Sequence, residues 1–219
     1  MNEPDVMVYL MTGFLDSGKS QFLKFTLTQD YFQIDGTTLL ILCEEGEEEF
    51  DPLEMAKHGV KIIKIEDQEE LTEAFLNELH EKYSPERVVI EYNGMWKVSD
   101  FEALNLPEGW EIEQKLTTVD ASTFQMYLTN LKPLFVEMVK GAELVLFNRC
   151  EDKKPLAGYR RSVKVVSPQA EVIFEDENGE VDNIFEDEVP YDLKAPVIEI
   201  PREDYGIWYV DMMDNLDKY

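Results

Sequence analysis

Residues 13–20 read G-F-L-D-S-G-K-S and fit the pattern G-x-x-x-x-G-K-[ST]. In such a loop, glycines let successive backbone N–H groups turn toward one anion, and the lysine reaches the outer oxygens of the bound β- and γ-phosphates. The hydroxyl of the last residue is a ligand for the Mg²⁺ ion that accompanies a nucleotide. The pattern predicts a nucleotide phosphate site, with Lys19 as a catalytic residue. Its binding residues are Gly13, Asp16, Ser17, Gly18, Lys19, Ser20 and Gln21.

Asp16 stands out in this loop because its carboxylate would lie close to the bound phosphates, and like charges at short range oppose binding. Aspartate tolerates a positive φ better than most residues do, so its N–H can still face the anion while the side chain points outward. We expect Asp16 to tune nucleotide exchange, or pairing between two copies of the chain, without abolishing binding.

The sequence around the loop predicts the strand, loop and helix that a phosphate site of this kind requires. Short apolar runs rich in β-branched residues alternate with segments whose apolar residues recur every three or four positions. This alternation predicts an α/β fold, a doubly wound, mostly parallel sheet with helices on both faces, as in P-loop NTPases. The expected strands are 6–11, 38–43, 60–65, 87–92, 116–120, 144–148 and 171–174, and the expected helices are 19–28, 69–83 and 123–140.

The character of the chain changes after residue 174. The stretch E-D-E-N-G-E-V-D-N-I-F-E-D-E is acidic and contains an Asn-Gly turn signal, and Pro190, Pro196 and Pro201 interrupt the residues that follow. We expect a nucleotide-binding domain over 1–175 and an acidic, extended C-terminal appendage over 176–219. The appendage is either the start of a further domain or an ordered extension of the first.

Composition narrows the partners and the compartment. The 219 residues include 20 Lys+Arg and 47 Asp+Glu, a net charge of −27, which disfavours nucleic acid and anionic membranes as partners. No apolar run approaches the roughly 18 to 20 residues that span a bilayer, and the acidic N-terminus lacks a signal-peptide pattern. With only two cysteines, Cys43 and Cys150, we expect a cytoplasmic protein with free thiols and no membrane insertion.

The chain resembles the CobW-like GTPases, relatives of the metallochaperone GTPases UreG and HypB. The family's loop typically reads G-F-L-G-A-G-K-T, which differs from this one chiefly at Asp16, where a glycine is usual. The resemblance implies GTP or GDP and Mg²⁺ as cofactors, slow GTP hydrolysis, homodimers, and metal handling for a client protein or a transition-metal ion. The family's N-E-F-G-E-V-G-I-D, I-E-x-x-G, V-D-A and N-K-x-D segments are similar, in this order, to residues 43–51, 90–94, 119–121 and 148–151.

Two features of the family are missing from this chain. Its metal-binding G-C-x-C-C segment is replaced by K-I-E-D-Q-E-E at 64–70, which contains no cysteine. Its usual C-terminal domain is replaced by the acidic appendage. The resemblance therefore supports a nucleotide site more strongly than it supports a metallochaperone role.

The shared segments suggest roles for two residues near the γ-phosphate. Glu91 ends an expected buried strand, at the edge of the sheet where ligands bind in open α/β folds. A carboxylate there can hold a Mg²⁺-bound water or orient the attacking water, so Glu91 is a candidate catalytic residue. Gly94 would let a backbone N–H approach the γ-phosphate. The alternative for Glu91 is an ordinary carboxylate at a strand end.

The segment N-R-C-E at 148–151 suggests how the base is recognised. A carboxylate at Glu151 would accept hydrogen bonds from guanine N1–H and its 2-amino group, which adenine cannot offer in the same way. Asn148 and the aliphatic stem of Arg149 would lie against the base. Glutamate is one methylene longer than the family's aspartate, so Asp152 could substitute after a register shift, and a polar loop without ligand contacts is the alternative.

The acidic run C-E-E-G-E-E-E-F-D at 43–51 has two interpretations. As a switch, it would sense the γ-phosphate and Mg²⁺ through Glu47 or Asp51. As a charge run, it would be a solvated loop, because five glutamates beside a phosphate site repel the ligand unless a cation screens them. The predicted metal ligands are Ser20, Glu47, Asp51 and Glu91.

The sequence favours a GTP-binding switch with slow, Mg²⁺-dependent hydrolysis. Two other classes stay open. The first is a nucleotide-binding regulatory or scaffold module with little hydrolysis, which Asp16 and the altered N-R-C-E would suit. The second is an ATP-dependent phosphotransferase of the kinase type.

Overall fold

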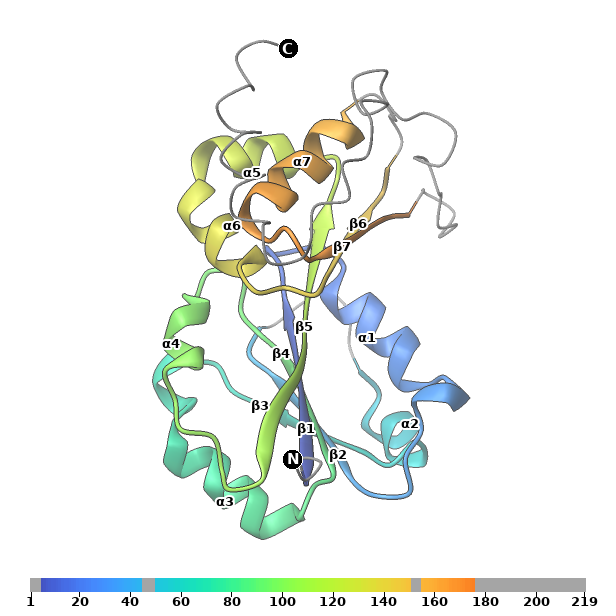
Figure 1. The fold of residues 1–219 in the computed structure, drawn as a ribbon. Helices are drawn as coiled ribbons and strands as arrows, with labels where there is room; N and C mark the ends of the chain where they lie inside the picture. Colours follow the sequence, from blue (N-terminus) through green and yellow to red (C-terminus); the bar gives the residue numbers. More distant parts are fainter. Residues whose placement is uncertain (1–4, 45–49, 151–154, 176–219) are drawn as a thin grey trace, which may run out of the picture. The chain divides into compact units, whose positions relative to one another are not determined.

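The computed structural model describes residues 5–44, 50–150 and 155–175 (Figure 1). These residues form a seven-stranded sheet in which each of the six strand pairings is parallel. The α/β architecture of a P-loop NTPase is thereby confirmed, whereas the expected appendage at 176–219 lies outside the described residues. The strands are β1 (Val6–Thr12), β2 (Thr38–Leu42), β3 (Val60–Lys64), β4 (Arg87–Glu91), β5 (Trp110–Asp120), β6 (Leu144–Asn148) and β7 (Glu171–Phe174), in the spatial order β3-β2-β4-β1-β5-β6-β7.

The strands follow from their apolar runs. All five residues of β2 and of β4 are buried, as expected for parallel strands that are covered on both faces. Strand β5 is longer than the expected 116–120, because its first half is mostly polar: Glu111, Glu113 and Gln114 surround the exposed Ile112 and leave no continuous apolar run. That half is held by backbone pairing with β1, whose register shifts between Val8 and Tyr9.

The helices cover both faces of the sheet. Figure 1 shows α1 and α2 on one side of the strands and α3 and α4 on the other. The chain runs one way along the sheet from β1 to β3 and the opposite way from β3 to β7, and right-handed crossovers place α5, α6 and α7 on the side of α3. The helices are α1 (Lys19–Leu27), α2 (Pro52–Lys57), α3 (Glu73–Tyr83), α4 (Val98–Glu102), α5 (Phe124–Asn130), α6 (Lys132–Val139) and α7 (Leu156–Val166), with 3₁₀ turns at Asp30–Phe32 and Gln68–Glu70.

Two expected helices differ from those observed. The helix expected at 123–140 is two helices, because Leu131 has φ −127 and ψ 32 and Pro133, in the first turn of α6, has no N–H to continue the ladder of α5. The helix expected at 69–83 begins at Glu73. Thr72 caps it by accepting a hydrogen bond from the N–H of Phe75 at 3.2 Å.

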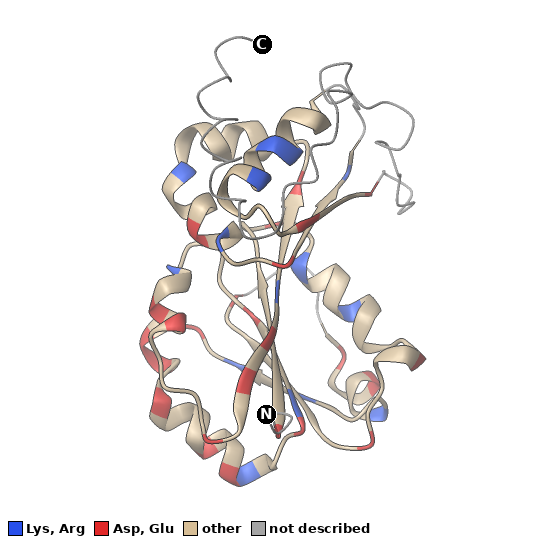
Figure 2. Ribbon diagram, in the orientation of Figure 1, with Lys and Arg blue, Asp and Glu red and all other residues tan. Residues whose placement is uncertain are grey.

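Acidic residues lie along α3 and α4, whereas α7 carries only basic charged residues (Figure 2). The excess negative charge in these helices is spread over helical surface, where water solvates it. Among the helices of residues 5–44, 50–150 and 155–175, none combines the length and the hydrophobicity that a bilayer crossing requires.

The core beneath α1 fixes the position of the phosphate loop. Leu23 and Leu27 of α1 are buried in an apolar cluster with Met11 of β1, Leu40 of β2 and Met55 of α2. Burial of these side chains holds α1 against the sheet, so its N-terminus starts where β1 ends. The carboxyl ends of β2, β4, β5 and β6 meet at the same edge, which is where open α/β sheets bind their ligands.

Candidate functional site

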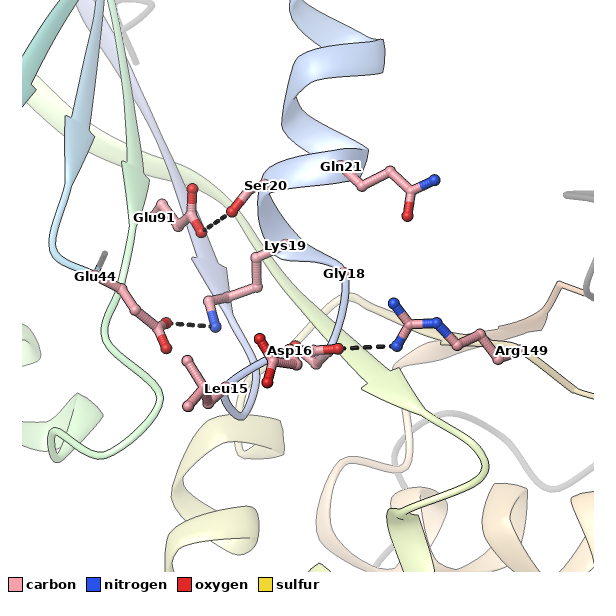
Figure 3. Close-up of a pocket in the computed structure, with 10 residues that line it drawn as sticks. Leu15, Asp16, Gly18, Lys19, Ser20, Gln21, Glu44, Glu91 and Arg149 are labelled. Carbon is pink, nitrogen blue, oxygen red and sulfur yellow. Dashed lines mark hydrogen bonds and ion pairs between the residues drawn. The ribbon is translucent and has the colours of Figure 1, made fainter. Parts of the chain in front are cut away.

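A pocket lies at this edge of the sheet, between the phosphate loop and the ends of the neighbouring strands (Figure 3). It contains the predicted loop residues from Asp16 to Gln21, and it adds two predicted residues from elsewhere, Glu91 and Arg149. Leu15 and Glu44, which were not among the predicted site residues, also line it. The full set is Leu15, Asp16, Ser17, Gly18, Lys19, Ser20, Gln21, Glu44, Glu91 and Arg149.

The backbone of the loop has the left-handed turns that a phosphate cradle needs. Asp16 has φ 57 and Gly18, the N-cap of α1, has φ 89. A Cβ at Gly18 would collide with the Nδ2 atom of Asn148, so glycine is required there by space as well as by backbone angle. Gly18 leads directly into α1, whose N-terminal N–H groups favour an anion.

Three hydrogen bonds fasten the loop to the ends of β5 and β6. The Ser17 hydroxyl bonds Thr118 Oγ1 at 2.9 Å, and Asn148 Nδ2 donates to the Ser17 carbonyl at 2.8 Å. Arg149 Nη1 donates to the Asp16 carbonyl at 2.9 Å. Asn148 and Arg149, predicted from N-R-C-E to contact the base, thus hold the loop in this structure. With these carbonyls satisfied from behind, the loop is set for its N–H groups to bind an anion.

Asp120, at the end of β5, holds Arg149 in place. Its Oδ2 lies 2.6 Å from Arg149 Nη1, and its Oδ1 accepts hydrogen bonds from the backbone N–H and the hydroxyl of Ser122 at 2.8 and 2.6 Å. Burial by itself would raise the pKa of Asp120, but the hydrogen bonds from Ser122 and Arg149 outweigh it and the pKa lies below its usual value. Asp120 was absent from the predicted site residues, although V-D-A ends a strand beside β1.

Lys19 is almost fully buried, with 3% of its surface exposed. Its Nζ donates to the carbonyls of Gly13 at 3.0 Å and Phe14 at 2.9 Å, and it forms an ion pair with Glu44 Oε2 at 2.6 Å. Glu44 follows β2 almost directly, and β2 lies beside β4, which brings this carboxylate to the lysine. Sequence analysis kept Glu44 in the resemblance but gave it no role.

Glu91 and Ser20 form a pair suited to a divalent cation. The Ser20 hydroxyl donates to Glu91 Oε1 at 2.6 Å, and among the described residues nothing donates to the buried Oε2. Burial raises the pKa of Glu91, the hydrogen bond from Ser20 and the charge of Lys19 lower it, and Glu44 raises it, with a net rise. A carboxylate and a hydroxyl are hard oxygen ligands, and the unpartnered oxygen gives a cation a place to bind, so these residues fit Mg²⁺.

The other predicted residues have different positions. Asp51 is exposed and caps α2 by accepting from the N–H of Leu53 at 2.8 Å, and it does not line the pocket. Gly94 packs on the loop, since a Cβ there would lie 2.5 Å from the carbonyl oxygen of Gly13. Glu47 and Glu151 lie outside the described residues.

The two cysteines are free and buried. Burial, followed by the charges of Glu91 and Glu44, raises the pKa of Cys43, so this residue is a neutral thiol and a poor metal ligand. Within residues 5–44, 50–150 and 155–175, no three His, Cys, Asp or Glu side chains are grouped to hold a metal ion.

Solved structures share the fold at low sequence identity. The Zn(II)-bound YjiA GTPase of E. coli is 21% identical with a TM-score of 0.59, over 84% of this chain and 60% of that one, and a triple mutant of YjiA gives the same values. The hydrogenase maturation factor HypB of Archaeoglobus fulgidus is 13% identical with a TM-score of 0.53, over 80% of this chain and 83% of that one. This chain therefore spans about 60% of the length of YjiA. No curated protein matches the chain.

A family model identifies the domain more specifically than these structures do. The model for the CobW/HypB/UreG nucleotide-binding domain matches residues 7–174. That span includes the phosphate loop, the Ser20–Glu91 pair and the strand ends that surround the pocket. The chain belongs to the CobW/HypB/UreG family, and residues 7–174 are its nucleotide-binding domain.

Proposed function

We propose that this chain binds GTP with Mg²⁺, hydrolyses it slowly and acts as a nucleotide-dependent switch. The observation that carries the proposal is the Ser20–Glu91 pair at the N-terminus of α1, next to the buried Lys19. A cationic side chain, a helix N-terminus and a pair of hard oxygen ligands at one point are the parts that phosphoryl transfer requires.

Each group of pocket residues has its own role in the proposed function. The loop N–H groups and the N-terminus of α1 bind the α- and β-phosphates, and Lys19 binds the β- and γ-oxygens. Ser20 and Glu91 would hold Mg²⁺, which would neutralise negative charge on the phosphates. Glu91 also orients the attacking water, and the backbone N–H of Gly94, next to the loop, stabilises charge that develops on the γ-phosphate.

We place guanine recognition at residues 148–151. Asn148 and Arg149 support this assignment, because they lie at the end of β6 and bond to the phosphate loop. The discrimination rests on the carboxylate of Glu151, which would pair with guanine N1–H and the 2-amino group. Competition between GTP and ATP tests this assignment, and a preference for ATP would remove the role of Glu151.

The output of the switch is metal handling or insertion, for a client protein or a transition-metal ion. Two structural relatives support this: YjiA was solved with Zn(II), and HypB is a hydrogenase maturation factor. Because residues 64–70 contain no cysteine, we propose that the chain acts on the metal through a client rather than through that segment. Pairing of two copies across their nucleotide sites is part of the proposal.

A second candidate function is a nucleotide-binding regulatory module with little hydrolysis. Two observations favour it: Glu44 forms an ion pair with Lys19, and the phosphate loop carries the exposed carboxylate of Asp16. Both features add negative charge where the γ-phosphate would bind, which disfavours a fast catalytic cycle.

Titration with GTP, GDP and ATP, with and without Mg²⁺, followed by GTP turnover measurements, tests these functions. We expect Mg²⁺-dependent GTP binding and slow turnover, both lost in Lys19→Ala. Tight binding with turnover no higher than that of Lys19→Ala would support the regulatory module instead. Failure to bind any of the three nucleotides would overturn both candidates.

A further inference from the structure

Three oxygens of the protein surround the ammonium group of Lys19 in this structure. Its Nζ donates hydrogen bonds to the carbonyls of Gly13 and Phe14, and the third oxygen, Glu44 Oε2, is an ion-pair partner that accepts no hydrogen bond from the described residues. A phosphate that binds Lys19 would compete with these oxygens for the cation. The two carbonyls belong to the phosphate loop itself, whereas Glu44 comes from another segment, after β2.

Glu44 is an anion on the cation that a phosphate would bind. Its carboxylate lies 2.6 Å from Lys19 Nζ, its side chain is only 9% exposed, and it lines the same pocket as the loop (Figure 3). Little water screens an ion pair that is this deeply buried, so the two charges attract each other more strongly than on the surface. The same lysine is the residue that the γ-phosphate of a nucleotide needs.

Glu44 and a nucleotide cannot both keep this position. Glu44 and Glu91 line the same pocket, so two carboxylates already lie where a phosphate would bind. A nucleotide phosphate would bring further negative charge to the same cation. Loss of the Lys19–Glu44 pair would accordingly accompany phosphate binding, and the affinity measured for a nucleotide would include the cost of breaking it.

We infer that Glu44 is an internal competitor for nucleotide phosphate: it holds Lys19 while the pocket is empty and is expelled when a phosphate arrives. This inference rests on the proposed nucleotide function and adds a residue to it. Expulsion moves the carboxylate that follows β2. Glu44 thereby makes the chain at the end of β2 sensitive to occupancy of the phosphate site.

Glu44→Gln tests the inference because glutamine keeps the shape of the side chain and removes its charge. Glu54→Gln is the matched control, since Glu54 is an exposed residue of α2 and the substitution makes the same change in net charge. The ligands are GTP, titrated with Mg²⁺, and inorganic tripolyphosphate, titrated in EDTA so that a cation bridging Glu44 to phosphate does not contribute. Association rates are followed with a fluorescent GTP analogue.

We expect Glu44→Gln to bind both ligands roughly tenfold more tightly than Glu54→Gln and wild type. The gain should appear in the association rate, because Lys19 no longer has to be released from Glu44 before a phosphate binds. If wild type binds GTP and Glu44→Gln binds it equally or less tightly, the inference is overturned and the proposed function stands. If neither protein binds GTP but Glu44→Gln binds tripolyphosphate more tightly, the competitor role stands and the nucleotide function fails. If neither ligand binds either protein, both fail.

A double-mutant cycle with Lys19→Met tests the ion pair without any ligand. Thermal unfolding of wild type, Glu44→Gln, Lys19→Met and the double variant should reveal non-additive losses of stability, because each single variant leaves a buried polar or charged partner behind. Additive effects would mean that the pair does not hold Lys19, and the inference would fall.

Discussion

Arg149 Nη1 lies 2.6 Å from Asp120 Oδ2 and 2.9 Å from the carbonyl oxygen of Asp16. One guanidinium thus joins the end of β5 to the phosphate loop, and it does so from a residue with φ 53, a backbone angle that an arginine rarely adopts. The bonds of Arg149 to Asp120 and Asp16 offset the energetic cost of this backbone angle and hold the residue in it.

Asp120→Asn should loosen the loop. The neutral amide loses the ion pair with Arg149, so we expect about 1 kcal/mol less unfolding free energy near pH 7, as for a partly exposed pair, and faster nucleotide release. The pKa of Asp120 is lowered in the folded protein, so its contribution is present above the unfolded value of about 3.9 and is lost as the pH falls through the lower folded value. Chemical denaturation of wild type and variant at a series of pH values from 7 downward measures this. A stability difference that grows as the pH falls would contradict the assignment.

Glu91→Gln should have the opposite pH dependence. Because the pKa of Glu91 is raised in the folded protein, ionising it costs stability as the pH rises from the unfolded value of about 4.3 toward the higher folded value. We expect the ligand-free variant to be more stable than wild type at pH 7 and equal to it at the acid end of this range. The same variant should lose the Mg²⁺ dependence of nucleotide binding. Glu78→Gln, in α3, is a surface control that should change neither property.

Asp16→Gly and Asp16→Asn separate charge from backbone in the phosphate loop. Asp16 already has φ 57, which glycine and asparagine also tolerate, so neither substitution should break the loop. We expect both variants to bind nucleotide several-fold more tightly and to release it more slowly, because a carboxylate near the phosphates is gone. Unchanged affinity, release rate and self-association in both would show that Asp16 has no functional effect.

Gly94→Ala should displace the phosphate loop. A Cβ at this position would lie 2.5 Å from the carbonyl oxygen of Gly13 and 2.9 Å from the N–H nitrogen of Leu15, both backbone atoms that can move only with the loop. We expect at least a roughly tenfold loss of nucleotide affinity, about 1.4 kcal/mol, measured by titration.

Gly158→Ala is the control for Gly94→Ala. Gly158 lies within α7, and a Cβ there meets no atom within 4 Å. Alanine is favoured over glycine in a helix by about 1 kcal/mol, so the control should raise the melting temperature and leave nucleotide binding unchanged. Equal affinities for the two variants would contradict the role given to Gly94.

The phosphate loop and the sheet could be predicted because their signals are local. The glycines, Lys19 and Ser20 all lie within residues 13–20, and each strand except β3 and β5 contains at least three consecutive apolar residues. Glu44 and Asp120 were missed because their roles arise from strand order. β2 lies next to β4 and β5 lies next to β1, which places both carboxylates by the loop, and no spacing in the sequence records that adjacency.

Two helix errors had other causes. The break between α5 and α6 carried a signal in Pro133, which the apolar period over 123–140 concealed. Helix α7 was not predicted at all, because only Leu156 and Val163 of its eleven residues are buried and its basic residues obscure the period.

Asp51 was expected at the metal because a carboxylate near a phosphate site suggests a ligand, but a residue directly before Pro52 is also well suited to cap a helix.

The phosphate loop is bonded differently on its two sides. Asp16 and Ser17 are bonded to β5 and β6 by contacts that a ligand need not break, whereas Lys19 and Ser20 are bonded to Glu44 and Glu91, from the β2 and β4 side. Under the proposed function, loss of a terminal phosphate would change the partners of only the second group. We expect the end of β2 to respond to the identity of the bound nucleotide, while the half of the domain around α5, α6 and α7 does not move.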